Sequence, residues 1–295
     1  MRVAAFILGF CTAAQAYQYG YNHPPFLKDD ETAAAYFPDI DVELLSPAFL
    51  KPESRPADFS NSTQGPTSLE VLNSYIKSLA EKNSWVTYKR FNGVKKVRVW
   101  IQGAIHGDEP GADQAVLAVL GKLNANQKWA RSLLRRLDIF ILPRYSADGV
   151  FYFQYVLASN YDPNRDHIKL AREQTRNVKA AFSKFAPHVA VDAHEFAGTR
   201  QYGRWHHGAD YLLAAAKNLN IHPDIRHMAE SLFTANAAEA LEAKGVRWES
   251  YVTSKANTDV NSNTTFTEAS SDAKIGHNAM GPTQCISFLS ETRGR

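Results

Sequence analysis

The feature that most constrains the fold is a regular alternation of strand-like and helix-like segments from Thr67 onward. Residues 97–101 alternate apolar side chains with others, which predicts a half-buried strand, whereas residues 69–79 place leucine and isoleucine at helical spacing. Strands that alternate with helices are typical of α/β proteins. We therefore predict an α/β fold, with one domain over residues 67–295 and a mixed, mostly parallel central sheet flanked by helices.

The same patterns predict the other elements of this domain. A proline opens the helix at residue 223, where its fixed φ suits a first helical position, and Thr67-Ser-Leu-Glu70 has the pattern of a capping box. The remaining predicted helices cover residues 113–123, 170–185 and 223–244, and the remaining strands cover 137–142, 188–193, 246–252 and 285–289.

Composition excludes several classes of protein. The chain has 295 residues, of which 44% are apolar and 12% aromatic, so it is neither a disordered segment nor, with two cysteines, a disulfide-rich mini-domain. Its net charge of +3 gives no electrostatic reason to expect nucleic acid as a partner. No window is long and apolar enough to span a bilayer, so we expect no membrane partner. Oligomeric state is left open.

The first sixteen residues have the organisation of a secretory signal peptide. Arg2 supplies the positive charge, residues 3–11 are apolar, and Ala14-Gln-Ala16 is a cleavage pattern. We predict that residues 1–16 are removed, that the mature chain begins at Tyr17, and that it is secreted and extracellular. The sequons at Asn61 and Asn263 are consistent with a glycoprotein.

Residues 17–66 differ in composition from the rest of the chain. They hold seven of the thirteen prolines, and that density disfavours regular structure. We interpret this stretch as a Pro-rich N-terminal arm, either a removable pro-segment or a strap that packs on the main domain.

Metal-ligating residue types follow two of the predicted strands. His106 and Glu109 come after the first strand and before a helix, where the carboxyl ends of parallel strands bind ligands. The strand over residues 188–193 is followed by His194. Two histidines and a carboxylate are the donors of many catalytic zinc sites, which leave a fourth position for water. The sequence therefore predicts one Zn²⁺ bound by His106, Glu109 and His194.

Two further segments carry residues suited to chemistry. Asn164 and Arg165 lie in a short proline-containing loop, and an arginine with an adjacent amide donor is suited to grip a substrate carboxylate. The last apolar strand runs into Glu291, where a general base would be placed. Glu195 and Glu268 are the alternatives for that proton carrier.

In this order, the motifs resemble those of the zinc carboxypeptidase family, the relatives of carboxypeptidase A. The resemblance covers roughly residues 67–294, and it implies a zinc carboxypeptidase-like fold. It implies that His106, Glu109 and His194 bind zinc, and that Asp162 hydrogen-bonds a ligating histidine. It further implies that Asn164 and Arg165 hold the C-terminal carboxylate of a peptide or protein and that Glu291 is the catalytic base.

The sequence departs from the family pattern at four places. Ser146 and Ala147 replace the usual Asn-Pro of a turn. No arginine lies between Gly149 and Asn164, where the family often has one that polarises the scissile carbonyl, and Arg144 is the nearest candidate to bind substrate there. No tyrosine follows Tyr251. Only four residues follow Glu291, where relatives have a closing helix, so we expect a domain truncated after Glu291.

These observations predict a secreted zinc carboxypeptidase that hydrolyses the C-terminal peptide bond with zinc-activated water. One alternative is a zinc amidohydrolase that deacylates N-acyl amino acids on the same fold. The other is an inactive zinc-binding secreted relative. The preferred C-terminal side chain of the substrate is not predicted.

Overall fold

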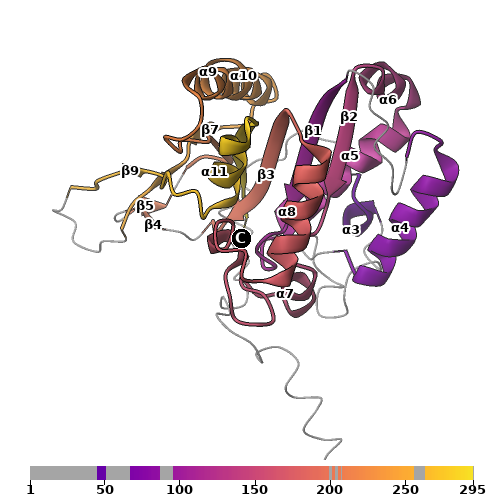
Figure 1. The fold of residues 1–295 in the computed structure, drawn as a ribbon, viewed down its shortest axis with the longest axis horizontal. Coiled ribbons are helices and arrows are strands. Elements are labelled where there is room, and N and C mark those ends of the chain that lie inside the picture. The colour runs from indigo at the N-terminus through magenta and orange to yellow at the C-terminus, as the bar shows by residue number, and fades with distance from the viewer. Residues whose placement is uncertain are drawn as a thin grey trace, which may run out of the picture.

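A computed structural model describes residues 45–50, 67–86, 96–198, 201–202, 205–206, 208–255 and 263–294 (Figure 1). The predicted signal peptide, most of the predicted Pro-rich arm and the sequon at Asn61 lie outside these residues. No helix among the described residues has the length and apolar character needed to cross a bilayer.

A six-stranded sheet forms the centre of the molecule, in the order β2-β1-β3-β10-β6-β7. Strand β6 runs antiparallel to β10, and the other neighbouring pairs are parallel. This topology confirms the predicted mixed, mostly parallel sheet. The strands are β1 (Val97–Gly103), β2 (Leu137–Leu142), β3 (Val189–Phe196), β6 (Tyr211–Ala215), β7 (Trp248–Ser250) and β10 (Ile286–Arg293). Two small sheets pair β4 (Gln201–Tyr202) with β5 (Trp205–His206) and β8 (Val252–Thr253) with β9 (Thr267–Glu268).

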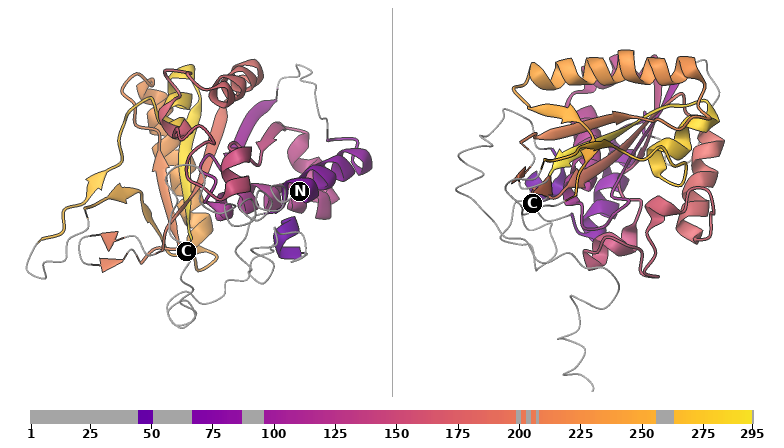
Figure 2. Two further views of the ribbon diagram at one scale, coloured as in Figure 1. Left: turned by 90° about the horizontal axis from the view of Figure 1, so that it is seen from below. Right: turned by 90° about the vertical axis from the view of Figure 1, so that its left-hand side faces the viewer.

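Helices flank this sheet, as Figures 1 and 2 show from three directions. Helix α5 packs against β1, β2, β3 and β10, and α3, α4 and α6 lie beside this layer. The helices of this group are α3 (Pro47–Leu50), α4 (Leu69–Lys82), α5 (Pro110–Ala125) and α6 (Gln127–Leu134). The others are α7 (Ala147–Tyr152), η3 (Pro163–Arg165), α8 (Glu173–Phe185), α9 (Pro223–Met228), η4 (Ala229–Thr234), α10 (Ala235–Glu242), α11 (Gly276–Met280) and η5 (Gly281–Thr283).

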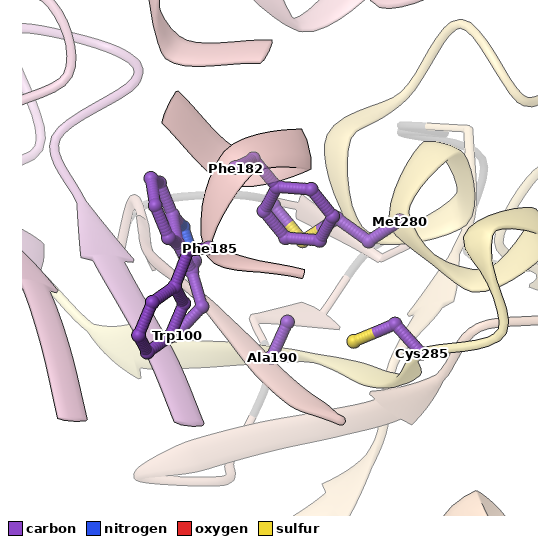
Figure 3. Packing of buried hydrophobic residues seen from close by; sticks show 6 residues of the cluster. All are labelled: Trp100, Phe182, Phe185, Ala190, Met280 and Cys285. Carbon is purple, nitrogen blue, oxygen red and sulfur yellow. The ribbon is translucent and has the colours of Figure 1, made fainter. Parts of the chain in front are cut away.

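The two faces of β1 and β3 have different packing partners. On one face, Trp100 stacks on Phe140 with ring centroids 4.1 Å apart and meets Phe182 of α8 edge to face at 5.2 Å. Phe185, Ala190, Met280 and Cys285 complete this cluster (Figure 3). The opposite face packs Ile101 and Ala193 against Ala112 and Val116 of α5. Because side chains alternate along a strand, residues two apart share a face.

The structure corrects several predicted boundaries. Ser68, not Thr67, caps α4 by accepting a hydrogen bond from the Val71 amide, because the Thr67 hydroxyl is buried and donates to Gln114. The predicted strand over residues 246–252 is divided between β7 and β8, which belong to different sheets. Strand β6 was not predicted, and β10 continues past Leu289 to Arg293.

Part of the predicted N-terminal arm packs on the domain. Residues 45–50 include helix α3, and the buried Ser46 hydroxyl donates a 2.5 Å hydrogen bond to Gln114 of α5. A Cβ at Gly121 of α5 would overlap the backbone oxygen of Leu45. This short stretch therefore behaves as a strap on α5.

Candidate metal centre

The turn between β1 and α5 presents two of the predicted ligands. Ala104 has a φ of 53°, which bends the chain sharply after β1. Gly107 lies so close to the backbone of Gly149 that no side chain fits there. Pro110 then begins α5. Both His106 and Glu109 are thereby placed above the carboxyl end of the sheet, as the sequence predicted.

The turn meets β3 at a cluster of three potential ligands. Nδ1 of His106 lies 2.6 Å from Oε1 of Glu109, and Nδ1 of His194 lies 2.9 Å from Oε2 of the same carboxylate. One ligand atom from each residue lies within 4.8 Å of the other two. All three side chains are nearly inaccessible to solvent, since the most exposed of them, Glu109, is 12% exposed. The three predicted metal-ligating residues therefore come together.

The charges of the clustered side chains suit the binding of a cation. Burial works against ionisation of Glu109, but the two imidazoles outweigh it and lower the pKa of its carboxyl to about 2. Burial likewise works against protonation of His106, yet the Glu109 carboxylate raises the pKa of His106 to about 9. The site thus favours positive charge between a fixed carboxylate and two nitrogens. Two imidazoles and a carboxylate are also a donor set suited to zinc.

Asp162 connects this cluster to the Asn-Arg loop. Its Oδ1 lies 3.3 Å from Nε2 of His106 and accepts a hydrogen bond from the Asn164 amide, and its Oδ2 lies 3.6 Å from Nη1 of Arg165. Burial opposes ionisation of Asp162, but His106 outweighs it and lowers the pKa of the carboxyl. Asp162 therefore occupies the position predicted for a residue that hydrogen-bonds a ligating histidine.

Asn164 and Arg165 differ in how firmly they are held. Asn164 is buried, and its Oδ1 accepts a 2.7 Å hydrogen bond from the amide of Gly276, at the start of α11. The Arg165 side chain is 44% exposed, and its Nη1 donates to the Asn164 carbonyl. The amide is thus fixed in the fold, while the guanidinium faces solvent near the cluster.

Glu291 lies on the strand next to His194. In the parallel pairing of β3 and β10, Glu291 is directly opposite His194, so the two side chains leave the same face of the sheet. Its exposed fraction is 7%. This register places the predicted base beside a predicted ligand.

The two alternative acids have other contacts. The Glu195 carboxylate accepts a hydrogen bond from the amide of Gly111, in the first turn of α5. Glu268 is 73% exposed and pairs with Lys217 at 2.8 Å. Glu195 therefore caps a helix and Glu268 makes a surface ion pair, whereas Glu291 lies on the strand beside His194.

Arg144 is held away from a substrate role. Its Nη2 donates to Oδ2 of Asp113 at 2.5 Å and to the carbonyl of Thr67 at 2.7 Å, and its side chain is 5% exposed. Asp113 belongs to α5 and is fully buried. The guanidinium therefore links α5 to the residue just before α4. The sequence had predicted that it would contact substrate.

Sequence reasoning did not single out two residues that contact the ligands. The ring of Tyr155 stacks on His106, with centroids 3.8 Å apart and planes 18° apart. Oδ2 of Asp192 lies 3.5 Å from Nε2 of His194. Asp192 did carry a signal, because an acidic residue inside an apolar strand, two positions before a ligand, shares that ligand's face.

Two buried histidines lie on the same side of β3 as Asp192. His167 follows the Asn-Arg loop, and His277 belongs to α11. Burial lowers the pKa of each to about 4 despite the nearby charge of Asp192. Both are therefore neutral at pH 7.

Comparison with known proteins tests the predicted family resemblance. A family profile described as zinc carboxypeptidase matches residues 71–210, which include all three clustered ligands and the Asn-Arg loop. Over these residues the chain resembles the zinc carboxypeptidase family. The predicted resemblance is confirmed.

Curated relatives named carboxypeptidase 2 are similar over most of the chain. Carboxypeptidase 2 of Trichophyton equinum is 47% identical over 95% of the chain, and carboxypeptidase 2 of Trichophyton rubrum is 46% identical over the same share. The chain spans 57% of the length of each of these relatives.

Solved structures share the zinc carboxypeptidase fold. A metallo-carboxypeptidase from Burkholderia cenocepacia superposes with a TM-score of 0.54 at 15% identity, over 77% of this chain and 60% of that one. Carboxypeptidase A from Helicoverpa armigera gives 0.53 at 15% identity, over 77% and 64%. These similarities establish the architecture.

Proposed function

We propose that the protein is a secreted zinc carboxypeptidase, which removes the C-terminal residue of peptides or proteins. The observation that carries this proposal is the position of Asp162 between the cluster and the Asn-Arg loop. Asp162 contacts His106 on one side and Arg165 on the other. A guanidinium that is linked to the metal cluster through a single side chain, Asp162, is suited to hold a substrate carboxylate beside the bond to be cleaved.

Binding positions the substrate. Arg165 offers a planar fork of donors that matches a carboxylate. The Asn164 side chain, fixed through Gly276, adds a neutral group beside it. Holding the free C-terminus in one place restricts cleavage to the last peptide bond and supplies part of the rate enhancement.

His106, Glu109 and His194 would hold one zinc ion. When bound, zinc lowers the pKa of a coordinated water and polarises a substrate carbonyl. Glu291, beside His194, accepts the proton of the attacking water and then donates a proton to the leaving amine. Burial of the cluster excludes bulk water from these transfers.

Secretion is proposed from the sequence of the first sixteen residues. N-terminal sequencing of the protein recovered from culture medium should find Tyr17 or a later residue. Recovery of a chain that begins at Met1 would contradict secretion through this signal.

The experiment for activity compares three substrate sets on the mature protein loaded with zinc. Peptides with a free C-terminus should lose their last residue, whereas the same peptides with an amidated C-terminus should be poor substrates. Hydrolysis of N-acyl amino acids but not of peptides would instead assign the chain to deacylation. Bound zinc with no turnover of any set would identify an inactive relative.

A further inference from the structure

His194 has a buried carboxylate on the side of its ring that faces away from Glu109. Its Nδ1 faces Glu109, and its Nε2 lies 3.5 Å from Oδ2 of Asp192, at the outer limit of a hydrogen bond. Within the described part of the chain, neither Nε2 of His194 nor Oδ2 of Asp192 has another hydrogen-bond partner. Asp192 is fully buried and His194 is 2% exposed. Each of the two atoms is thus available to the other.

The orientation of Asp192 is fixed from the other side by two strand residues. The Trp100 indole, which can only donate, gives its hydrogen bond to Oε1 of Gln102 at 2.8 Å. Gln102 is therefore oriented so that its Nε2 donates to Oδ1 of Asp192 at 2.9 Å. Gln102 is directly opposite Asp192 in the pairing of β1 with β3. This chain of donors leaves Oδ2 of Asp192 to accept from His194.

Packing prevents Asp192 from turning away. Gly276 begins α11 so close to Oδ2 of Asp192 that a Cβ at this position would overlap the oxygen. The same Cβ would lie 3.3 Å from Oδ1 of Asn164 and 3.3 Å from Nε2 of His167. The carboxylate is confined by β1 on one side and α11 on the other.

We propose that Asp192 is the positioning residue for His194, keeping the hydrogen of its imidazole on Nε2 so that the Nδ1 lone pair is directed at the metal. The inference rests on the proposed zinc centre. A histidine that binds a metal through one nitrogen is oriented by what its other nitrogen contacts. In this chain, the core residues Trp100 and Gln102 determine that Asp192 accepts and His194 donates in the contact between them.

The decisive variant is Asp192→Asn, which changes one atom and keeps the volume. Gln102 still has to donate, so Oδ1 of the new amide stays on Gln102 and its NH₂ group faces Nε2 of His194. Two donors then oppose each other, and the imidazole is driven to carry its hydrogen on Nδ1. Loss of such an outer contact costs about 10–100-fold in metal affinity.

Zinc affinity measured by competition with a chromogenic chelator tests this expectation without any peptide substrate. Asp192→Asn should bind zinc 10–100-fold more weakly than the parent, and the visible spectrum of its Co²⁺ form should change. The matched control is Asp113→Asn, which neutralises an equally buried aspartate on α5 that pairs with Arg144. The control should stay within about threefold of the parent. Circular dichroism of the metal-free variants confirms that both fold.

A double variant reverses the direction of the hydrogen bond between residues 102 and 192. In Gln102→Glu with Asp192→Asn, the glutamate can accept from both Trp100 and the new amide, so Oδ1 of residue 192 again faces His194. This double variant should recover most of the zinc affinity lost in Asp192→Asn.

Three results would overturn the inference. They are parental zinc affinity in Asp192→Asn, an equal loss in Asp113→Asn, and a double variant no better than Asp192→Asn. These outcomes are independent of the proposed function, because a protein that cleaves no peptide still reports its zinc affinity. Conversely, an active peptidase whose Asp192→Asn form holds zinc normally would contradict only the role of Asp192.

Discussion

The metal cluster and the Asn-Arg loop lie on either side of Asp162, yet they are built differently. Exposed fractions are 4% for His106 and 2% for His194, whereas the Arg165 side chain is 44% exposed. His106 and His194 are held by their contacts with Glu109, by the turn after β1 and by strand β3. The hydrogen bond and the ion pair of Arg165 both go to residues nearby in the chain, the Asn164 carbonyl and Asp162.

This difference shows that one site can combine rigid, buried metal ligands with a solvent-exposed group that recognises the substrate. A metal centre needs ligands whose geometry is set before the metal arrives, and burial among fixed partners provides that. A group that must admit and release a charged chain end needs access to solvent. Changes in the cluster should therefore affect metal binding first, and changes in the loop should affect substrate selection alone.

The largest effect should come from removing a ligand. His194→Ala leaves two of the three donors, so the variant should retain no stoichiometric zinc after dialysis and should show no peptidase activity. Atomic absorption of the dialysed protein measures this directly. Full zinc occupancy in His194→Ala would show that the clustered residues are not the ligands.

Glu291→Gln should separate chemistry from metal binding. Because Glu291 transfers protons and does not ligate, the variant should keep zinc and lose about 10²–10⁴-fold or more in turnover. Rapid-quench assays with a free-acid peptide, paired with zinc analysis, provide both readouts. Loss of zinc would indicate that Glu291 is a metal ligand. Near-parental turnover would indicate that Glu195 or Glu268 is the catalytic base.

Arg165→Lys should change selection without changing the metal. Lysine keeps the charge but not the planar fork, and truncating a charge pair that is buried on binding costs about 2–5 kcal/mol, which is roughly 30-fold or more in kcat/KM. Free-acid peptides should suffer this loss, whereas amidated peptides should change little. Equal cleavage of both peptide types by the parent would remove the carboxylate-anchor role from this loop.

The smallest effect on the site should come from Arg144→Lys. The buried guanidinium serves Asp113 and Thr67 together, and lysine at this position leaves one acceptor unsatisfied at a cost of about 1–3 kcal/mol in the free energy of unfolding. Urea unfolding of the zinc-free protein measures this cost. KM and zinc affinity should stay at parental values, and a raised KM would restore the predicted contact of Arg144 with substrate.

Local sequence patterns predicted the architecture and the ligands because both depend on short-range order. Strand alternation, a ligand pair three residues apart and a histidine at a strand end are each visible within ten residues. Strand β6 was missed because the run Tyr211–Ala215 is short and uniformly apolar, with no alternation to mark it.

Other features depend on contacts between distant segments. Thr67 was assigned as a cap, but its hydroxyl is taken by Gln114, 47 residues away. The partner of Arg144 lies 31 residues earlier, on a helix face that sequence alone does not orient. Asp192 was detectable in principle, since an acid in an apolar strand has to find a buried partner.

The aromatic cluster on one face of the sheet also limits how freely the interior can be redesigned. Trp100 packs against Phe140 and Phe182, so phenylalanine or methionine at this position would keep the interior apolar. Neither residue has an N–H to give to Gln102, and the amide would then be free to rotate. A library selected only for folding would accept such replacements, while the direction of the hydrogen bonds that end at His194 would be lost.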